Sequence, residues 1–259
     1  MGLELGFVTQ TTMHYTDALP AATAMNADYV ELLLDGHHER STLDADAVAE
    51  TATEHELDLL VHLPFGFDVG SPYEHVREGA IRELSAALET AAAFDARKAV
   101  VHASSDAWSP AWEAESVQGT IVDALAELEV VAGESGIELC VENVPGEWFG
   151  LAEFPRLFEA TDVSMTFDTG HAYVEGYDAA EQAAFVAEHA DRISHVHVND
   201  VRTRTDDHVP IGSGVLDFGR IVRPLATATL SAEVFTPSYE YVATSLNNLR
   251  RQVEALDSP

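Results

Sequence analysis

Residues 163–178 read VSMTFDTGHAYVEGYD, and this stretch contains the unit that decides the fold. It begins with a short apolar run, 163–168, ends that run in Asp168, and continues into a loop or helix that carries His171. Short apolar runs bounded by polar residues predict buried β-strands. Because the same unit recurs along the chain, the stretch is one member of a series.

Eight apolar runs share this character: 3–8, 28–34, 57–62, 98–103, 137–142, 163–168, 193–198 and 230–235. Amphipathic Ala/Leu/Glu-rich segments lie between them, most clearly 74–94 and 110–133, the second with proline in its first turn and glycine at its end. Eight alternations of strand and helix over about 250 residues are typical of a (β/α)₈ TIM barrel. We therefore predict an α/β fold with a single TIM-barrel domain over 1–259. The alternative, a doubly wound sheet, favours a glycine-rich first turn, and residues 1–12 contain no GxGxxG motif.

The charge balance is strongly acidic. The chain of 259 residues has 45 Asp and Glu against 13 Lys and Arg, a formal net charge of −32, and Lys98 is its one lysine. Such self-repulsion destabilises a fold unless salt screens it, which predicts adaptation to a high-salt cytoplasm. It also disfavours avid binding to nucleic acid, which depends on basic side chains. The absence of long apolar runs and of a signal-peptide pattern predicts a cytoplasmic protein with no membrane partner, and the single Cys140 excludes a cysteine metal cluster.

Six consecutive predicted strands carry a His, Asp or Glu at or near their C-terminal ends, where TIM barrels place their chemistry. The residues are His62, His102, Glu142, Asp168, His195 with His197, and Glu233. A helix cap or a loop hydrogen bond explains any one of them alone. Six together predict a divalent cation, because buried charges need compensation.

The types of ligand narrow the metal to Zn²⁺, Mn²⁺, Co²⁺ or Fe²⁺ rather than Ca²⁺. His195 and His197 face the same side of their strand, but only one of them can lie at the rim. We assign His197 as the ligand and His195 to the core or to the residues that support the ligands. Asp206 and His208 form a D-x-H pair in the following loop, over the same mouth.

That loop also contains two of the few cationic side chains. Arg202 and Arg204 predict contacts with an anionic or polyhydroxylated substrate, although a solvated surface pair is an equally good interpretation. Gly212 and Gly214 could bring backbone N–H groups close to a phosphate.

The ordered motifs resemble the xylose isomerase-like superfamily of metal-dependent TIM barrels, which includes sugar and sugar-phosphate isomerases and epimerases as well as endonuclease IV. The motifs are HLPF (62–65), VVHAS (100–104), VENV (141–144), FDTGHAYVEGYD (167–178), HVHVND (195–200), DDHVPIGSGVLDF (206–218) and AEVF (232–235). The resemblance implies that one divalent ion is held by Glu142, Asp168, His197 and Glu233. In the epimerase branch it implies that Glu142 and Glu233 exchange protons beside a carbonyl, that His171 contacts substrate, and that Arg202 or Arg204 binds it.

The endonuclease IV branch implies three zinc ions at the same mouth. The first set of ligands is His62, His102 and Glu142; the second is Glu142, Asp168, His197 and Glu233; the third is His171, Asp206 and His208. All nine positions are matched in this chain. With both branches considered, the resemblance implies one to three divalent ions, and we expect Zn or Mn.

We predict a metal-dependent sugar or sugar-phosphate isomerase or epimerase with Glu142 and Glu233 as the acid/base pair. The alternative is an endonuclease IV-like phosphodiesterase acting at abasic DNA, and only that alternative gives the protein a nucleic-acid partner. A non-catalytic sugar- or metal-binding barrel is a third interpretation. Arg250 and Arg251 in the last helix fit either a homo-oligomer interface or a solvated end.

Overall fold

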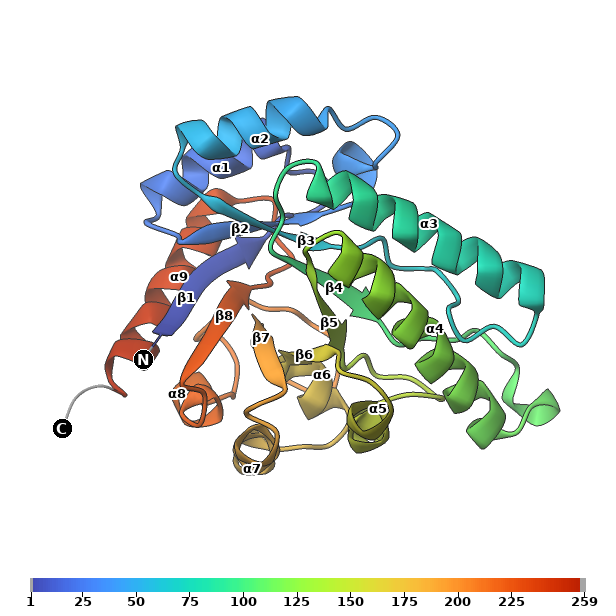
Figure 1. Ribbon diagram of the computed structural model, residues 1–259. Coiled ribbons are helices and arrows are strands. Elements are labelled where there is room, and N and C mark those ends of the chain that lie inside the picture. The colour runs from blue at the N-terminus through green and yellow to red at the C-terminus, as the bar shows by residue number, and fades with distance from the viewer. Residues whose placement is uncertain (1, 257–259) are drawn as a thin grey trace.

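The computed structural model describes residues 2–256, and they form one closed barrel of eight parallel strands in the order β1 to β8 (Figure 1). The strands are β1 Gly2–Val8, β2 Tyr29–Leu33, β3 Asp58–His62, β4 Lys98–His102, β5 Glu138–Glu142, β6 Ser164–Asp168, β7 Ile193–Val198 and β8 Thr227–Ala232. The predicted TIM barrel is confirmed. Residues 1 and 257–259 of the predicted domain lie outside the described residues.

Helices surround the barrel and connect successive strands (Figure 1). They are α1 Tyr15–Ala24, α2 Ala45–Glu54, α3 Glu74–Ala92, α4 Ala114–Glu134, α5 Phe154–Ala160, α6 Thr169–Val174, α7 Ala179–Glu188, α8 Phe218–Val222 and α9 Tyr239–Glu254, with 3₁₀ turns Gly36–His38, Ser109–Ala111 and Leu151–Glu153. Among residues 2–256, no helix has the length and apolar composition needed to cross a bilayer.

Seven of the eight predicted strands agree with the structure to within one residue at each end, whereas the eighth was wrong by three residues. The apolar run 230–235 suggested a strand that ends in Phe235, but β8 begins at Thr227 and ends at Ala232. Its register explains the difference, because β1 pairs with it from Gly2 opposite Thr227 to Phe7 opposite Ala232. Glu233 therefore follows the strand directly, at the mouth of the barrel.

The predicted helix 110–133 was wrong at its start, because α4 begins at Ala114, whereas its end at Glu134 agrees to within one residue. Pro110 lies in the 3₁₀ turn Ser109–Ala111, and extended residues separate this turn from α4, which begins at Ala114. Gly133 lies within the helix, and the glycine with positive φ is Gly136, at +73°, just beyond the helix end. This is where a glycine relieves the steric cost of the left-handed conformation.

Two packing layers result from the alternation of side chains along the strands. Val196 and Val198 of β7 belong to the apolar core, while His195 and His197 face the barrel interior. In the barrel register, Asp168 lies opposite His197, and His197 lies opposite Ser231. The barrel interior is therefore polar near its C-terminal mouth, and this polar layer contains the candidate site.

Candidate metal centre

The polar strand ends converge on a cavity of about 310 Å³ at the C-terminal mouth of the barrel. The predicted residues that line it are His62, His102, Glu142, His171, Asp206, His208 and Glu233. Asp168 and His197 are fully buried beside them. The structure thus brings together all nine side chains that the sequence suggested as metal ligands.

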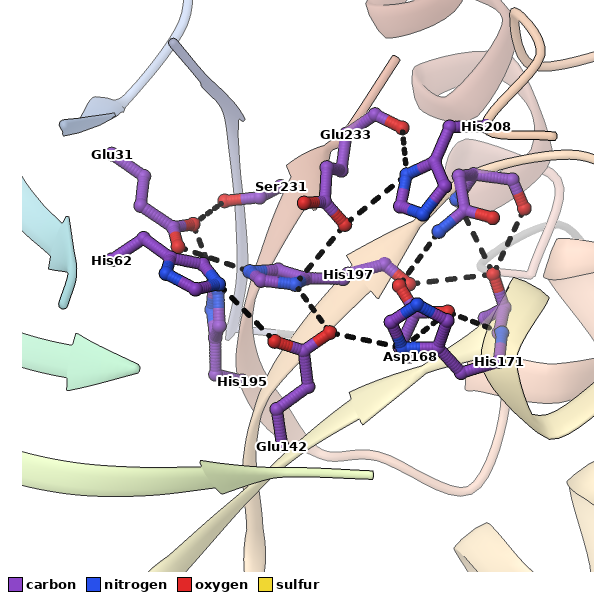
Figure 2. Close-up of polar contacts among 12 residues, drawn as sticks. Glu31, His62, Glu142, Asp168, His171, His195, His197, His208, Ser231 and Glu233 are labelled. Atoms are coloured by element: carbon purple, nitrogen blue, oxygen red, sulfur yellow. Dashed lines mark hydrogen bonds and ion pairs between the residues drawn. The ribbon is translucent and has the colours of Figure 1, made fainter. Parts of the chain in front are cut away.

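The central set consists of Glu142, Asp168, His197 and Glu233, whose candidate ligand atoms all lie within 4.8 Å of one another. His197 Nδ1 is 3.3 Å from Glu142 Oε1 and 3.3 Å from Glu233 Oε2 (Figure 2). Although both His197 Nδ1 and Glu233 Oε2 are buried, neither has a hydrogen-bond partner of acceptable geometry. Unpaired buried polar atoms are costly, so this pair indicates a site arranged for a ligand.

Two further sets flank the central one. Glu142 Oε2 lies 3.3 Å from His62 Nε2 and 3.1 Å from His102 Nε2, so this carboxylate uses one oxygen for each neighbouring set. On the other side, Asp206 Oδ1 is 3.4 Å from His171 Nε2 and 2.8 Å from His208 Nε2. The ligand groupings that the resemblance implied are therefore present as spatial clusters.

Backbone carbonyls orient three of these imidazoles. The Nδ1 atoms of His62, His171 and His208 lie 2.8, 2.9 and 3.3 Å from the carbonyl oxygens of Leu63, Asn143 and Glu233. A carbonyl only accepts, so each Nδ1 donates, and the lone pair of the neutral ring is on Nε2. That nitrogen faces the carboxylates in all three cases, as a metal ligand requires.

Asp168 caps helix α6 and also belongs to the central set. As the N-cap of α6, its Oδ1 accepts from the backbone N–H of His171 at 2.6 Å, and its Oδ2 accepts from Asn199 Nδ2 at 2.6 Å. Gly170 permits this approach, because a Cβ there would come within 1.9 Å of Asn199 Oδ1. The cap therefore holds the carboxylate in the central set, and the two interpretations of Asp168 are compatible.

The spacing of the sets fits a divalent ion. Two atoms that are each about 2.0–2.1 Å from a tetrahedral ion lie about 3.3–3.4 Å apart. The contacts of His197, His62 and His171 with their carboxylates are 3.3–3.4 Å. These values are longer than good N–H···O hydrogen bonds and close to ligand–ligand distances, whereas the contacts of His102 and His208 with their carboxylates, 3.1 and 2.8 Å, are ordinary hydrogen-bond lengths.

Mutual pairing shifts the pKa values within the metal-free cluster. Burial alone would raise the pKa of Glu233, but His197 and His208 lower it to about 2. Burial would lower the pKa of His208, but Glu233 and Asp206 raise it to about 9. Burial raises the pKa of Asp168 to about 6 against the opposing effect of His171. Without an ion, protonated imidazoles compensate the carboxylates, so metal binding must release protons.

Two predictions about the loop after β7 receive no support from the structure. Arg202 and Arg204 are exposed and do not line the cavity: Arg202 Nε donates to Ser213 O at 3.3 Å, and the Arg204 guanidinium lies over the Tyr173 ring. Substrate contact by either arginine stays a prediction. The suggested phosphate site at Gly212 and Gly214 was wrong, because their amides donate to Asp200 Oδ2 at 3.0 and 2.7 Å.

Sequence reasoning missed three buried polar residues at the site. Glu31, in the middle of β2, accepts from His197 Nε2 at 3.0 Å, and Asn143 and Asn199 hold Asp168 in place. The available signal for Glu31 was an acid with apolar residues on both sides within the run 28–34. For Asn143 and Asn199 the available signal was their position directly after the ends of β5 and β7.

Comparison with known proteins places this geometry in a family. Residues 19–258 match the family described as "Xylose isomerase-like TIM barrel". An uncharacterized protein of Methanocaldococcus jannaschii is 26% identical over 220 residues, 81% of this chain and 74% of the relative. The probable endonuclease 4 of Natranaerobius thermophilus is 31% identical over 212 residues, 73% of this chain and 70% of the relative. A solved D-tagatose 3-epimerase-like protein shares the fold with a TM-score of 0.84 at 23% identity, over 98% of both chains. The chain therefore belongs to the xylose isomerase-like TIM-barrel family.

Proposed function

We propose that the protein is a metal-dependent isomerase or epimerase that moves a proton beside the carbonyl of a small sugar. The observation that carries the proposal is the placement of Glu142 and Glu233. They approach His197 Nδ1 from the C-terminal ends of β5 and β8, at 3.3 Å each, and both line the same cavity. A substrate in that cavity would contact both carboxylates.

Proton transfer beside a carbonyl requires a base on one face of the carbon and an acid on the other. The pKa values of both glutamates are lowered in spite of burial, because histidines lie beside each. At neutral pH both glutamates are therefore anionic, so one can remove the proton, and the other must first take up a proton from a protonated neighbour or from solvent before it returns that proton on the opposite face. When bound to the central set, a divalent cation would supply Lewis-acid stabilisation of the charge that develops on the carbonyl oxygen. His62, His102 and His171 are placed to hold substrate hydroxyl groups.

The lining favours an uncharged sugar over a sugar phosphate. Among the described residues that line the cavity there is no lysine or arginine, and its neutral polar groups include Thr9, Gln10 and Thr11. Phosphate recognition in proteins commonly uses arginine or lysine. The amides of Gly212 and Gly214 already donate to a carboxylate.

Deuterium exchange tests this function. The metal-loaded protein in molar KCl is incubated in D₂O with a panel of ketoses, and the C–H signals beside the carbonyl are followed by NMR. Glu142→Gln and Glu233→Gln should each lower exchange about 10²–10⁴-fold, the usual contribution of a general acid or base. Glu147→Gln, an exposed glutamate away from the cavity, is the matched control. Unaltered exchange in both cavity variants would rule out the assigned roles.

A second function, metal-dependent phosphodiester cleavage at abasic DNA, is favoured by one specific observation. His171 Nε2 and His208 Nε2 both face Asp206 Oδ1, so His171 belongs to a third candidate ligand set rather than standing alone in the cavity. Adjacent metal ions can stabilise both the attacking and the leaving oxygen of a phosphodiester.

This second function has its own test. The zinc-loaded protein is incubated with a duplex that carries one abasic site, and cleavage is followed on a denaturing gel. Cleavage that His208→Ala abolishes together with about one bound ion per chain would support it. Absence of cleavage at three bound ions would eliminate it.

A further inference from the structure

Glu31 is a fully buried carboxylate near the middle of β2, and it lies outside the nine candidate ligands. Three side-chain donors surround it: His195 Nε2 at 3.0 Å, His197 Nε2 at 3.0 Å and Ser231 Oγ at 2.6 Å (Figure 2). They come from β7 and β8, across the barrel interior. An ionised carboxylate is acceptor-only, so each of these three groups donates its proton to Glu31.

This arrangement selects one tautomer of His197. The Nε2 proton points to Glu31, so the lone pair of the neutral ring is on Nδ1, between Glu142 and Glu233. In the other tautomer, Nδ1 would carry the proton and could not bind an ion. His62, His171 and His208 are held through backbone carbonyls, whereas His197 is held through a side chain.

The hydrogen bonds continue from Glu31 down the barrel to Lys98, the one lysine of the chain. His195 Nδ1 is 2.6 Å from Thr229 Oγ1, and Lys98 Nζ is 3.1 Å from the same oxygen. An ammonium group only donates, so Thr229 accepts from Lys98 and has one proton left to give. The contact of Thr229 Oγ1 with His195 Nδ1 is shorter than its 3.3 Å contact with Ser194 O. We therefore infer that the Thr229 hydroxyl donates its proton to His195 Nδ1, which accepts it. His195 then donates through Nε2 to Glu31.

A glycine in β1 leaves space for this series of hydrogen-bonded side chains. Gly6 of β1 lies opposite both Tyr29 and Ser231, and a Cβ at Gly6 would come within 2.5 Å of the Tyr29 ring. Without that side chain, Tyr29 crosses the strand, and its hydroxyl reaches Ser231 Oγ at 2.9 Å. Ser231 accepts from Tyr29 and still donates to Glu31. Every donor near Glu31 is thus fixed in direction.

We propose that Glu31 is a positioning residue that fixes His197 with Nδ1 as its metal-binding atom, and that Lys98, through Thr229 and His195, orients the donors that hold Glu31. The inference rests on the metal centre of the proposed function but not on the reaction that the centre performs. Partners of this kind, outside the ligand set, typically change metal affinity about 10–100-fold.

The experiment uses the full-length protein in molar KCl. The ¹⁵N-labelled protein is loaded with ¹¹³Cd²⁺, and long-range ¹H–¹⁵N and ¹¹³Cd–¹⁵N correlations identify the nitrogen of His197 that binds cadmium. We expect Nδ1 to bind and Nε2 to retain a slowly exchanging proton. Binding through Nε2 would overturn the proposal, and this readout needs no variant to fold.

Variants supply the second readout, the dissociation constant for Mn²⁺ measured by competition with a chelator. Glu31→Gln should weaken binding about 10–100-fold. Glu31→Asp, which keeps the charge but is too short to reach both histidines, should weaken it less. Lys98→Met should have a smaller effect than Glu31→Gln. The control Glu138→Gln, a partly exposed carboxylate 3.8 Å from Lys98, should match the wild type.

Equal affinity in wild type and a folded Glu31→Gln would contradict the proposal. A protein that binds cadmium through Nδ1 but exchanges no sugar proton would refute the proposed function and leave the role of Glu31 standing.

Discussion

The barrel interior holds two buried clusters of histidine and carboxylate that differ in one respect. The lower cluster, defined as Glu31, His195, Thr229 and Ser231, satisfies its polar atoms with hydrogen bonds of 2.6–3.0 Å. The upper cluster, defined as Glu142, Asp168, His197 and Glu233, leaves His197 Nδ1 and Glu233 Oε2 without partners. His197 belongs to the upper cluster and is bonded to the lower one through Nε2.

The difference shows how similar residues serve different purposes. A fully paired polar cluster in a low-dielectric interior specifies geometry, because each member has one favourable position. An incompletely paired cluster has atoms that a ligand can use, and its mutual repulsion is relieved when a cation arrives. We therefore expect the lower cluster to support the site and the upper cluster to bind the cation.

The largest expected effect comes from removing the residue that the two clusters share. His197→Gln should weaken Mn²⁺ binding more than about 100-fold, because loss of a supporting partner alone costs about 10–100-fold. The matched variant His195→Gln, two residues away in the lower cluster, should stay within about 10-fold of the wild type. Calorimetric titration measures both, and equal losses would remove the distinction between the clusters.

Removal of the metal should lower the free energy of unfolding, by less than the binding free energy that His197→Gln loses. At a free ion concentration 100 times the dissociation constant, binding to the native state adds about 2.7 kcal/mol to the free energy of unfolding. Scanning calorimetry in molar KCl before and after chelation should show a clear fall in Tm. An unchanged Tm would mean that the upper cluster is paired without an ion.

The pH dependence of the metal-free protein should follow the raised pKa of His208, about 9 against about 6.5 in an unfolded chain. Such a histidine stabilises the fold fully below about pH 6.5, and that contribution is lost as the pH rises through about 9. We expect Tm of the chelated protein to fall across this range, with a smaller fall in His208→Asn. In the metal-loaded protein the trend should weaken, because the bound ring is already deprotonated. If the Tm of the chelated wild-type protein does not change with pH over this range, the pairing of His208 with Glu233 and Asp206 is excluded.

The smallest effect should come from the exposed arginines. Arg202→Ala and Arg204→Ala should each change kcat/KM by no more than about twofold, because surface substitutions usually stay within about 0.5 kcal/mol. Steady-state kinetics on the sugar identified by exchange would measure this. A large rise in KM for either variant would restore the sequence-based prediction of substrate contact.

Local periodicity was enough to predict the barrel, because parallel strands buried on both faces have a continuous apolar signature. It failed at β8, where Thr227 and Thr229 make the strand less apolar than the loop that follows it. Only pairing with β1 defines that register. It failed at the start of α4 because a proline in a 3₁₀ turn resembles a proline in the first turn of a helix.

Six of the nine candidate ligands could be predicted because they lie at or next to a strand end, and strand ends share one rim. His171, Asp206 and His208 lie instead in the segments that follow β6 and β7. Glu31 could not be predicted, because its role depends on β7 and β8, more than 160 residues away in the sequence. The hydrogen bonds within the loop after β7 could not be predicted from the sequence either. Its glycines face Asp200, and nothing in the spacing of the residues reports that contact.

Anomalous scattering from crystals of the Mn²⁺-loaded protein would show directly whether the upper cluster holds the ion through His197 Nδ1. We predict a peak about 2.0–2.2 Å from His197 Nδ1 and from the carboxylates of the upper cluster, with Glu31 still bonded to His197 Nε2. Absence of an anomalous peak at the barrel mouth, with His197 Nδ1 donating to Glu142 or Glu233, would contradict this prediction.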